Sequence, residues 1–219
     1  MRKIWFVLAV AAAWMGTAAS PAQATDVPTI AAGDRVLGKA DAPITIFEFF
    51  SLTCPHCADF AAHTFPQVKT DWIDTGKAKL VYRDYPLDRN ALKAAMLARC
   101  APPERYPAFV ATLFQQQTGW GMMDDPTPVL RRIALLGGVS GDQFDKCMAD
   151  DELSKKIVAE EFDAHKDYGV ESTPTFFING KRVVGFMPYE EFAKELDRAT
   201  AALPARTKTA ARAAGTSQQ

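Results

Sequence analysis

The stretch FEFFSLTCPHC, residues 47–57, carries the features around which the rest of the chain is organised. Its apolar first half is typical of a buried strand, and its second half brings two cysteines to the first turn of a helix. Pro55 suits the first helical position, because it lacks a backbone N–H and its φ is preset near the helical value. Cys54 then caps the helix, where unpaired N–H groups and the helix dipole favour a thiolate. We therefore predict Cys54 as an exposed, acidic nucleophile and Cys57 as its partly covered partner.

A Cys-X-X-Cys pair alone fits a redox dithiol, half of a zinc site or a structural disulfide. Zinc would need two more ligands, yet the chain has only three histidines, and its other two cysteines lack the same spacing. We therefore predict no metal site. The strand-turn-helix setting and the downstream STPT, residues 172–175, favour the redox dithiol.

The segment EFFS, residues 48–51, followed by CPHC, residues 54–57, resembles the active-site segment of the DsbA family of thioredoxin-fold thiol oxidases. The resemblance covers nearly the whole chain after its first 24 residues. It implies an α/β, thioredoxin-like fold with an inserted α-helical subdomain. It also implies a reaction that needs no cofactor and a membrane quinone-linked partner, of the DsbB kind, that reoxidises the enzyme.

Three further parts of the site follow from this resemblance or from the positions of the residues in the sequence. Glu48 lies on a strand face that is otherwise apolar, and the resemblance implies a carboxylate beneath the dithiol. His56 stands between the cysteines, where its imidazole is expected within reach of the Cys54 sulfur. Pro174 is expected to be cis and to lie against the dithiol, which leaves the backbone of Thr173 free to bind an extended substrate. Taken alone, Pro174 would be a trans proline at a strand edge.

The N-terminus has the three parts of a cleavable signal peptide, residues 1–24. A basic start is followed by an apolar run well short of the ~20 residues that span a bilayer, and then by the small-x-small pattern Ala22-Gln23-Ala24. Removing Arg2 and Lys3 from the 25 basic residues leaves 23 against 26 acidic ones, a net charge of −3. So small a charge makes nucleic-acid binding a poor expectation. We expect export to the periplasm.

The order of the predicted elements is that of an interrupted α/β domain. Residues 44–50 and 79–86 are expected to form parallel strands joined by a helix that starts at Pro55, is kinked at Pro66 and stops at Gly76. Residues 175–184 form a hairpin with an Asn-Gly turn, and a helix runs from 188 to about 202. We assign residues 25–87 and 169–203 to the thioredoxin-like domain, and 204–219 to a disordered tail.

Residues 88–168 are helical almost throughout, which predicts an inserted helical subdomain rather than an ordinary crossover. Cys100 and Cys147 both lie on apolar stripes of helices in this insertion. Because an exported chain with four cysteines permits two bridges, we expect Cys100 and Cys147 to form a permanent disulfide. The alternative is two separate buried thiols that pack as small hydrophobic side chains.

The predicted function is that of a monomeric, exported thiol:disulfide oxidoreductase. Its Cys54–Cys57 disulfide would pass to unfolded or partly folded exported proteins by thiol–disulfide exchange. A disulfide isomerase or reductase on the same fold is the first alternative, although no dimerisation segment is visible. A copper-binding or chaperone-like module in which the dithiol does not turn over is the second.

Overall fold

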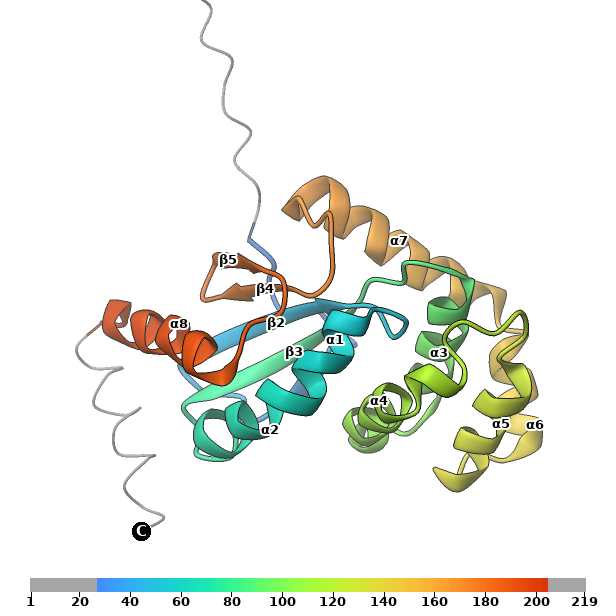
Figure 1. The fold of residues 1–219 in the computed structure, drawn as a ribbon. Helices are drawn as coiled ribbons and strands as arrows, with labels where there is room; N and C mark the ends of the chain where they lie inside the picture. The colour runs from blue at the N-terminus through green and yellow to red at the C-terminus, as the bar shows by residue number, and fades with distance from the viewer. Residues whose placement is uncertain (1–26, 205–219) are drawn as a thin grey trace, which may run out of the picture.

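The computed structural model describes residues 27–204, so the expected signal peptide and nearly all of the expected C-terminal tail lie outside the described residues. Five strands form one sheet in the order β1-β3-β2-β4-β5. The strands are β1 (Arg35–Leu37), β2 (Ile44–Phe50), β3 (Ala78–Asp84), β4 (Thr175–Ile178) and β5 (Lys181–Val184). Only the β2–β3 pair is parallel, and the other three pairs are antiparallel (Figure 1).

β2 occupies the middle of the sheet because its side chains are apolar on both faces. Ile46 and Phe50 belong to the larger buried cluster on one face, whereas Phe47 and Phe49 belong to a second cluster on the other. Glu48 lies in register with Tyr82 of β3. The buried carboxylate is thus fixed in the central strand, on the face that carries the larger cluster.

The hairpin between β4 and β5 turns at Asn179 and Gly180, as predicted. Both residues have positive φ, 46° and 89°. Such angles favour glycine and are tolerated by asparagine, which explains why this dipeptide stands at a turn whose twist matches that of the strands. The hairpin fixes β4 beside β2, and residues 173–174 lie directly before β4.

The helix that begins at Pro55 is interrupted twice. It runs as α1 (Pro55–Asp59), a π-helical segment (Phe60–Thr64), α2 (Phe65–Val68) and a second π-helical segment (Lys69–Ile73). Pro66 has no N–H to donate, and its ring crowds the carbonyl one turn earlier, so a widened turn before it relieves the clash. The predicted kink therefore takes the form of π-helical turns rather than a simple bend.

Five α-helices and two short 3₁₀ turns follow β3 and precede β4, and we refer to this whole stretch as the helical segment. The α-helices are α3 (Arg89–Cys100), α4 (Tyr106–Gln115), α5 (Thr127–Leu136), α6 (Gly141–Met148) and α7 (Asp151–Tyr168). Figure 1 shows α3 to α6 gathered beyond one end of the sheet, while α7 returns along one sheet face. The chain's last described helix, α8 (Tyr189–Ala202), contacts β2 and β4 on the opposite face.

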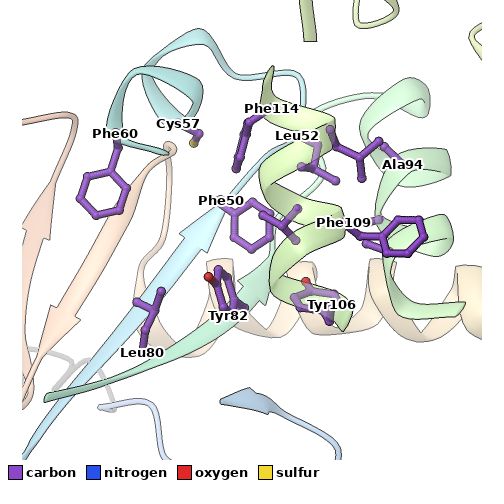
Figure 2. Packing of buried hydrophobic residues seen from close by; sticks show 14 of the residues in the cluster. Phe50, Leu52, Cys57, Phe60, Leu80, Tyr82, Ala94, Tyr106, Phe109 and Phe114 are labelled. Atoms are coloured by element: carbon purple, nitrogen blue, oxygen red, sulfur yellow. The ribbon is translucent and has the colours of Figure 1, made fainter. Parts of the chain in front are cut away.

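One continuous hydrophobic cluster joins the sheet to the helical segment. Phe50 of β2 packs against Tyr82 and against Phe114 of α4, with ring centroids 5.9 and 5.8 Å apart. Figure 2 shows Cys57 entering this cluster from α1, with Phe60 and Phe114 on either side of it in this view. The second cysteine of the dithiol is therefore part of the core. Across residues 27–204, no helix has both the length and the apolarity of a bilayer span.

Candidate active site

Cys54 caps the start of α1. Its φ and ψ of −75° and 121° are extended rather than helical, and Pro55 follows at the first helical position. The carbonyl of Cys54 accepts the first hydrogen bond of the helix, from the N–H of Ala58 at 3.2 Å. The predicted capping position of the nucleophile is thus present in the structure.

The prediction that Cys54 is exposed is wrong, although Cys54 is more exposed than Cys57. Cys54 exposes 6% of its surface and Cys57 none, so both thiols are buried, and Cys54 is merely the more accessible one. The reason lies in the loop before β4, where the carbonyl of Thr173 accepts the S–H of Cys54 at 3.2 Å. A loop more than a hundred residues away in the chain covers the sulfur, and neighbouring residues in the sequence could not reveal it.

The surroundings of Cys54 lower its pKa from an ordinary 9.0 to about 5. The largest cause is the hydrogen bond from the Cys57 side chain, and burial opposes it. Once Cys54 ionises, the Thr173 side chain and the backbone N–H groups of Cys57 and His56 form further hydrogen bonds that favour the thiolate. At neutral pH the reduced protein therefore carries a thiolate at Cys54.

Cys57 titrates in the opposite direction. Burial is the largest cause that raises the pKa of Cys57 far above its ordinary value, and the hydrogen bond to Cys54 and the charge of Cys54 raise it further. In the reduced pair, Cys54 is thus a negatively charged and more accessible thiolate, whereas Cys57 is a buried, neutral thiol. A low-pKa, more accessible sulfur beside a buried one suits thiol–disulfide exchange, because the thiolate is the reacting form and a low-pKa thiol is the better leaving group.

Glu48 lies in the core near the dithiol, as predicted. Only 3% of its surface is exposed, and burial raises the pKa of its carboxyl to about 8. The Glu48 charge is one of the causes that raise the pKa of Cys57. Glu48 also lines a cavity of about 40 Å³ between the first π-helical segment and α4, a space large enough for a water molecule.

The loop that ends at β4 forms the second wall of the site. The Thr173–Pro174 peptide bond is cis. The Tyr85 hydroxyl, 2.9 Å from the carbonyl of Val170, anchors the start of this loop to the end of β3. The Thr173 hydroxyl is buried and has no hydrogen-bond partner among the described residues, so it is free to donate to a thiolate at Cys54.

The imidazole of His56 points elsewhere than the sequence suggests. It is 71% exposed, and its Nδ1 lies 3.8 Å from a carboxylate oxygen of Asp59. Between the described residues, no hydrogen bond joins this ring to Cys54. What His56 gives to Cys54 in this structure is its backbone N–H, which any residue other than proline would supply.

Two side chains from outside the CPHC motif hold the loop that precedes Cys54. The hydroxyl of Thr53 donates to Asp88 at 2.6 Å, and Asp88 also caps α3 by accepting the N–H of Ala91 at 2.8 Å. The carboxamide of Gln117 donates to the carbonyls of Leu52 and Cys54. Neither contact was expected from the sequence. The Asp88 cap had a sequence signal, an Asp before an Ala-rich helix, but the Gln117 contact had none.

Cys100 and Cys147 are joined by a disulfide, with Cα atoms 6.2 Å apart. The bond ties the last residue of α3 to α6, within the helical segment. No three His, Cys, Asp or Glu side chains between residues 27 and 204 gather as a metal-binding cluster would require. Cys54 and Cys57 are the two cysteines that the structure leaves free.

Comparison with known proteins agrees with the fold and with the dithiol described above. A family model described as thioredoxin matches residues 11–198. A protein of Rickettsia bellii described as a putative protein-disulfide oxidoreductase is 35% identical over 148 residues, which are 67% of this chain and 57% of that protein. The chain thus spans less than two thirds of the length of this curated relative.

Two solved structures show the similarity in three dimensions. The alpha-DsbA1 structure of Wolbachia pipientis is 34% identical, with a TM-score of 0.73, and the match covers 79% of this chain and 92% of that one. The oxidised BdbD structure of Bacillus subtilis is 25% identical, with a TM-score of 0.67, covering 80% and 96% of the two chains. These matches confirm the α/β, thioredoxin-like fold and the resemblance to DsbA proteins.

Proposed function

This chain belongs to the thioredoxin family, among the DsbA-like proteins, and we propose that it is an exported thiol:disulfide oxidoreductase that introduces disulfides into other proteins. The observation that carries the proposal is the contrast between the two thiols, with the Cys54 pKa lowered to about 5 and the Cys57 pKa raised. A stabilised thiolate favours the reduced enzyme, so the oxidised enzyme readily gives up its disulfide.

The proposed reaction has two steps. A substrate thiolate attacks the Cys54 sulfur of the Cys54–Cys57 disulfide, which forms a mixed disulfide and releases Cys57 as a thiolate that takes up a proton. A second substrate thiolate then attacks the substrate sulfur of the mixed disulfide, and Cys54 leaves as a thiolate. Two electrons pass from the substrate to the enzyme. Glu48, close to Cys57 and itself with a raised pKa, is the group we propose to exchange that proton.

The substrates we propose are unfolded or partly folded exported proteins. Exposed apolar side chains near the loop of residues 51–54 support this proposal: Leu87, whose N–H donates to the Ser51 hydroxyl, is 53% exposed, and Met122 and Met123 are 94% and 42% exposed. The two methionines line a hollow of about 310 Å³ together with Asp88, the residue that holds Thr53. Flexible methionines suit contacts with varied apolar segments. Thr173 and Pro174 would bind the substrate backbone beside Cys54.

Several further statements belong to the same proposal. Residues 1–24 would direct the chain to the periplasm, where the monomeric enzyme would be reoxidised by a membrane quinone-linked partner of the DsbB kind. Residues 88–168 would form a helical subdomain inserted into a thioredoxin-like domain made of residues 25–87 and 169–203. Cys100–Cys147 would be a permanent structural bond.

The direct test mixes the oxidised protein with reduced, unfolded ribonuclease A. We expect one substrate disulfide to form for each enzyme disulfide consumed. A Cys54→Ser variant should form none, and a Cys57→Ser variant should accumulate little product because its remaining thiol cannot hold the oxidising disulfide. An enzyme that instead reduces insulin efficiently, and leaves the ribonuclease thiols free, would point to the reductase or isomerase alternative.

A further inference from the structure

Gln117 reaches from the helical segment to the active-site loop, residues 51–54. It follows α4 in a short 3₁₀ turn (Gln117–Gly119), and only 9% of its surface is exposed. Its Nε2 donates to the carbonyl of Leu52 at 2.8 Å and to the carbonyl of Cys54 at 3.0 Å. A carboxamide nitrogen has two hydrogens, so both donors are used on this one loop.

The turn that carries Gln117 is itself tightly held. The carbonyl of Gln117 accepts the N–H of Gly121 at 2.7 Å, and a Cβ at position 121 would lie 2.9 Å from that oxygen, so only glycine fits. Trp120 is fully buried, and its indole N–H donates to Leu113 at 3.1 Å. Asn90 of α3 donates to the carbonyls of Gly121 and Met123. The position of the carboxamide is therefore fixed by the surrounding core.

We propose that Gln117 is a positioning residue of the exchange reaction. Through it, the helical segment holds Cys54 in place at the start of α1. The inference rests on the proposed function and extends it beyond the CPHC motif. The two carbonyls that Gln117 binds flank Thr53, whose side chain is held by Asp88. The backbone on both sides of Thr53 is thus restrained from outside the loop.

This restraint matters because the thiolate depends on geometry. The N–H groups of His56 and Cys57 favour the thiolate only while the Cys54 sulfur lies over the end of the helix. The carbonyl of Cys54 already accepts the helical hydrogen bond from Ala58, and Gln117 supplies its second donor. Losing Gln117 would let the loop move and would weaken the alignment of the sulfur with these donors.

The test replaces Gln117 by methionine, which has a similar length but no donor. The reduced protein is titrated by the ultraviolet absorbance of the thiolate, and the rate of Cys54 alkylation is measured at pH 4, below the wild-type pKa, where a rise in pKa lowers the thiolate fraction most. We expect the Cys54 pKa to rise by about one unit, with a several-fold lower alkylation rate. Asn90→Leu is the matched control, because it removes two hydrogen bonds from the same turn and leaves both bonds of Gln117 to the loop.

A shift in Gln117→Met that exceeds the shift in Asn90→Leu by half a unit or more supports the proposal. Equal shifts, or none in either variant, overturn it, since Gln117 would then act only on stability. Should Gln117→Met fail to fold, Gln117→Asn permits the same decision, because its shorter side chain keeps the amide but withdraws it from the two carbonyls. The titration does not depend on oxidase activity, so a failure of the proposed function would show separately in the ribonuclease assay.

Discussion

At the scale of single residues, the site consists of three groups whose ionisation is shifted by their surroundings. Cys54 is made acidic by hydrogen bonds from Cys57, from Thr173 and from the backbone at the start of α1. Cys57 and Glu48 are kept neutral by burial. Since each shift is a difference between the folded and unfolded states, each also makes the stability of the protein depend on pH.

The first prediction concerns Cys54 in the reduced protein. Its pKa is lowered on folding from 9.0 to about 5, so its contribution to the free energy of unfolding is complete above pH 9 and is lost as the pH falls to 5. Chemical denaturation of reduced wild type and of Cys54→Ser should give stabilities that diverge as the pH rises through this window. After allowance for solvent screening, we expect up to about 1 kcal/mol per pH unit.

Both proteins contain Glu48, so its own titration cancels in this comparison. A stability difference that stays constant from pH 5 to 9 would contradict the lowered pKa of Cys54.

The second prediction concerns Glu48, whose shift has the opposite sign. Burial raises its pKa from 4.5 to about 8, so its contribution to the free energy of unfolding is complete below pH 4.5 and is lost as the pH rises to 8. Glu48→Gln removes the cost of keeping this carboxyl protonated in the folded state, and it should raise the free energy of unfolding at pH 7 by about 1–3 kcal/mol, with little effect at pH 4.

Glu171→Gln, at an exposed position, serves as the control and should leave stability nearly unchanged. A Glu48→Gln protein that is less stable than wild type at pH 7 would mean that the carboxylate is held by a favourable partner.

At the scale of elements, the site forms where the start of α1 meets the loop before β4. Thr173 stands on this loop next to the sulfur of Cys54, with a buried hydroxyl that has no hydrogen-bond partner within residues 27–204. While Cys54 is a thiol it donates to the Thr173 carbonyl, and once it ionises the hydroxyl becomes the better partner. The loop is therefore built to bind the charged form of the nucleophile.

Thr173→Val should for this reason raise the pKa of Cys54 by about one unit, because the methyl group keeps the volume and removes the donor. Thr175→Val is a close control: its hydroxyl donates to Ser172 at 2.7 Å in the same loop and is not among the groups that shift Cys54. Thiolate absorbance as a function of pH separates the two variants. If both shift the pKa equally, the effect belongs to the loop as a whole.

Some elements could be predicted from the sequence because their signals are local. Pro55 predicts a helix start, Asn179-Gly180 predicts a tight hairpin, and the apolar run of β2 predicts a central strand. The π-helical turns before and after α2 could not be foreseen in the same way. Pro66 predicts an irregularity in the helix, but the packing of the surrounding core determines whether that irregularity is a bend or a π-helical turn.

The site, like the fold, was predictable only where its signals lie close together in the sequence. The CPHC motif and the proline before β4 can be recognised in the sequence. Gln117, in contrast, is the last of three consecutive glutamines, and no local feature distinguishes it from its neighbours. Its two hydrogen bonds reach across 63 and 65 residues of chain. The burial of Cys54 under Thr173 is a contact of the same tertiary kind.

At the scale of the whole molecule, a disulfide ties α3 to α6 within the helical segment. Cys100 and Cys147 are separated by 47 positions, and closing a loop of this length removes up to about 4 kcal/mol of unfolded-state entropy. A Cys100→Ser, Cys147→Ser double variant should lose about 2–4 kcal/mol in unfolding by denaturant. Equal stability of the two proteins would mean that packing alone holds these helices.

The labelling pattern gives an independent check on the same bond. After mild reduction of the native protein, alkylation should be confined to the Cys54 and Cys57 pair, as seen by intact mass, with Cys54 reacting first because Cys57 is fully buried. Labelling of Cys100 or Cys147 in the native, unreduced protein would show that the bond does not form.

The measurement that most directly tests the central claim is the equilibrium potential of Cys54–Cys57 against glutathione. The Cys54 pKa of about 5 lies about two units below the value of about 7 in thioredoxin. At pH 7 this stabilises the reduced form by about 2 kcal/mol more, or about 50 mV for two electrons. We therefore predict a potential near −220 mV, above the roughly −270 mV of thioredoxin. A value at or below −270 mV would contradict the assignment of this protein as an oxidase.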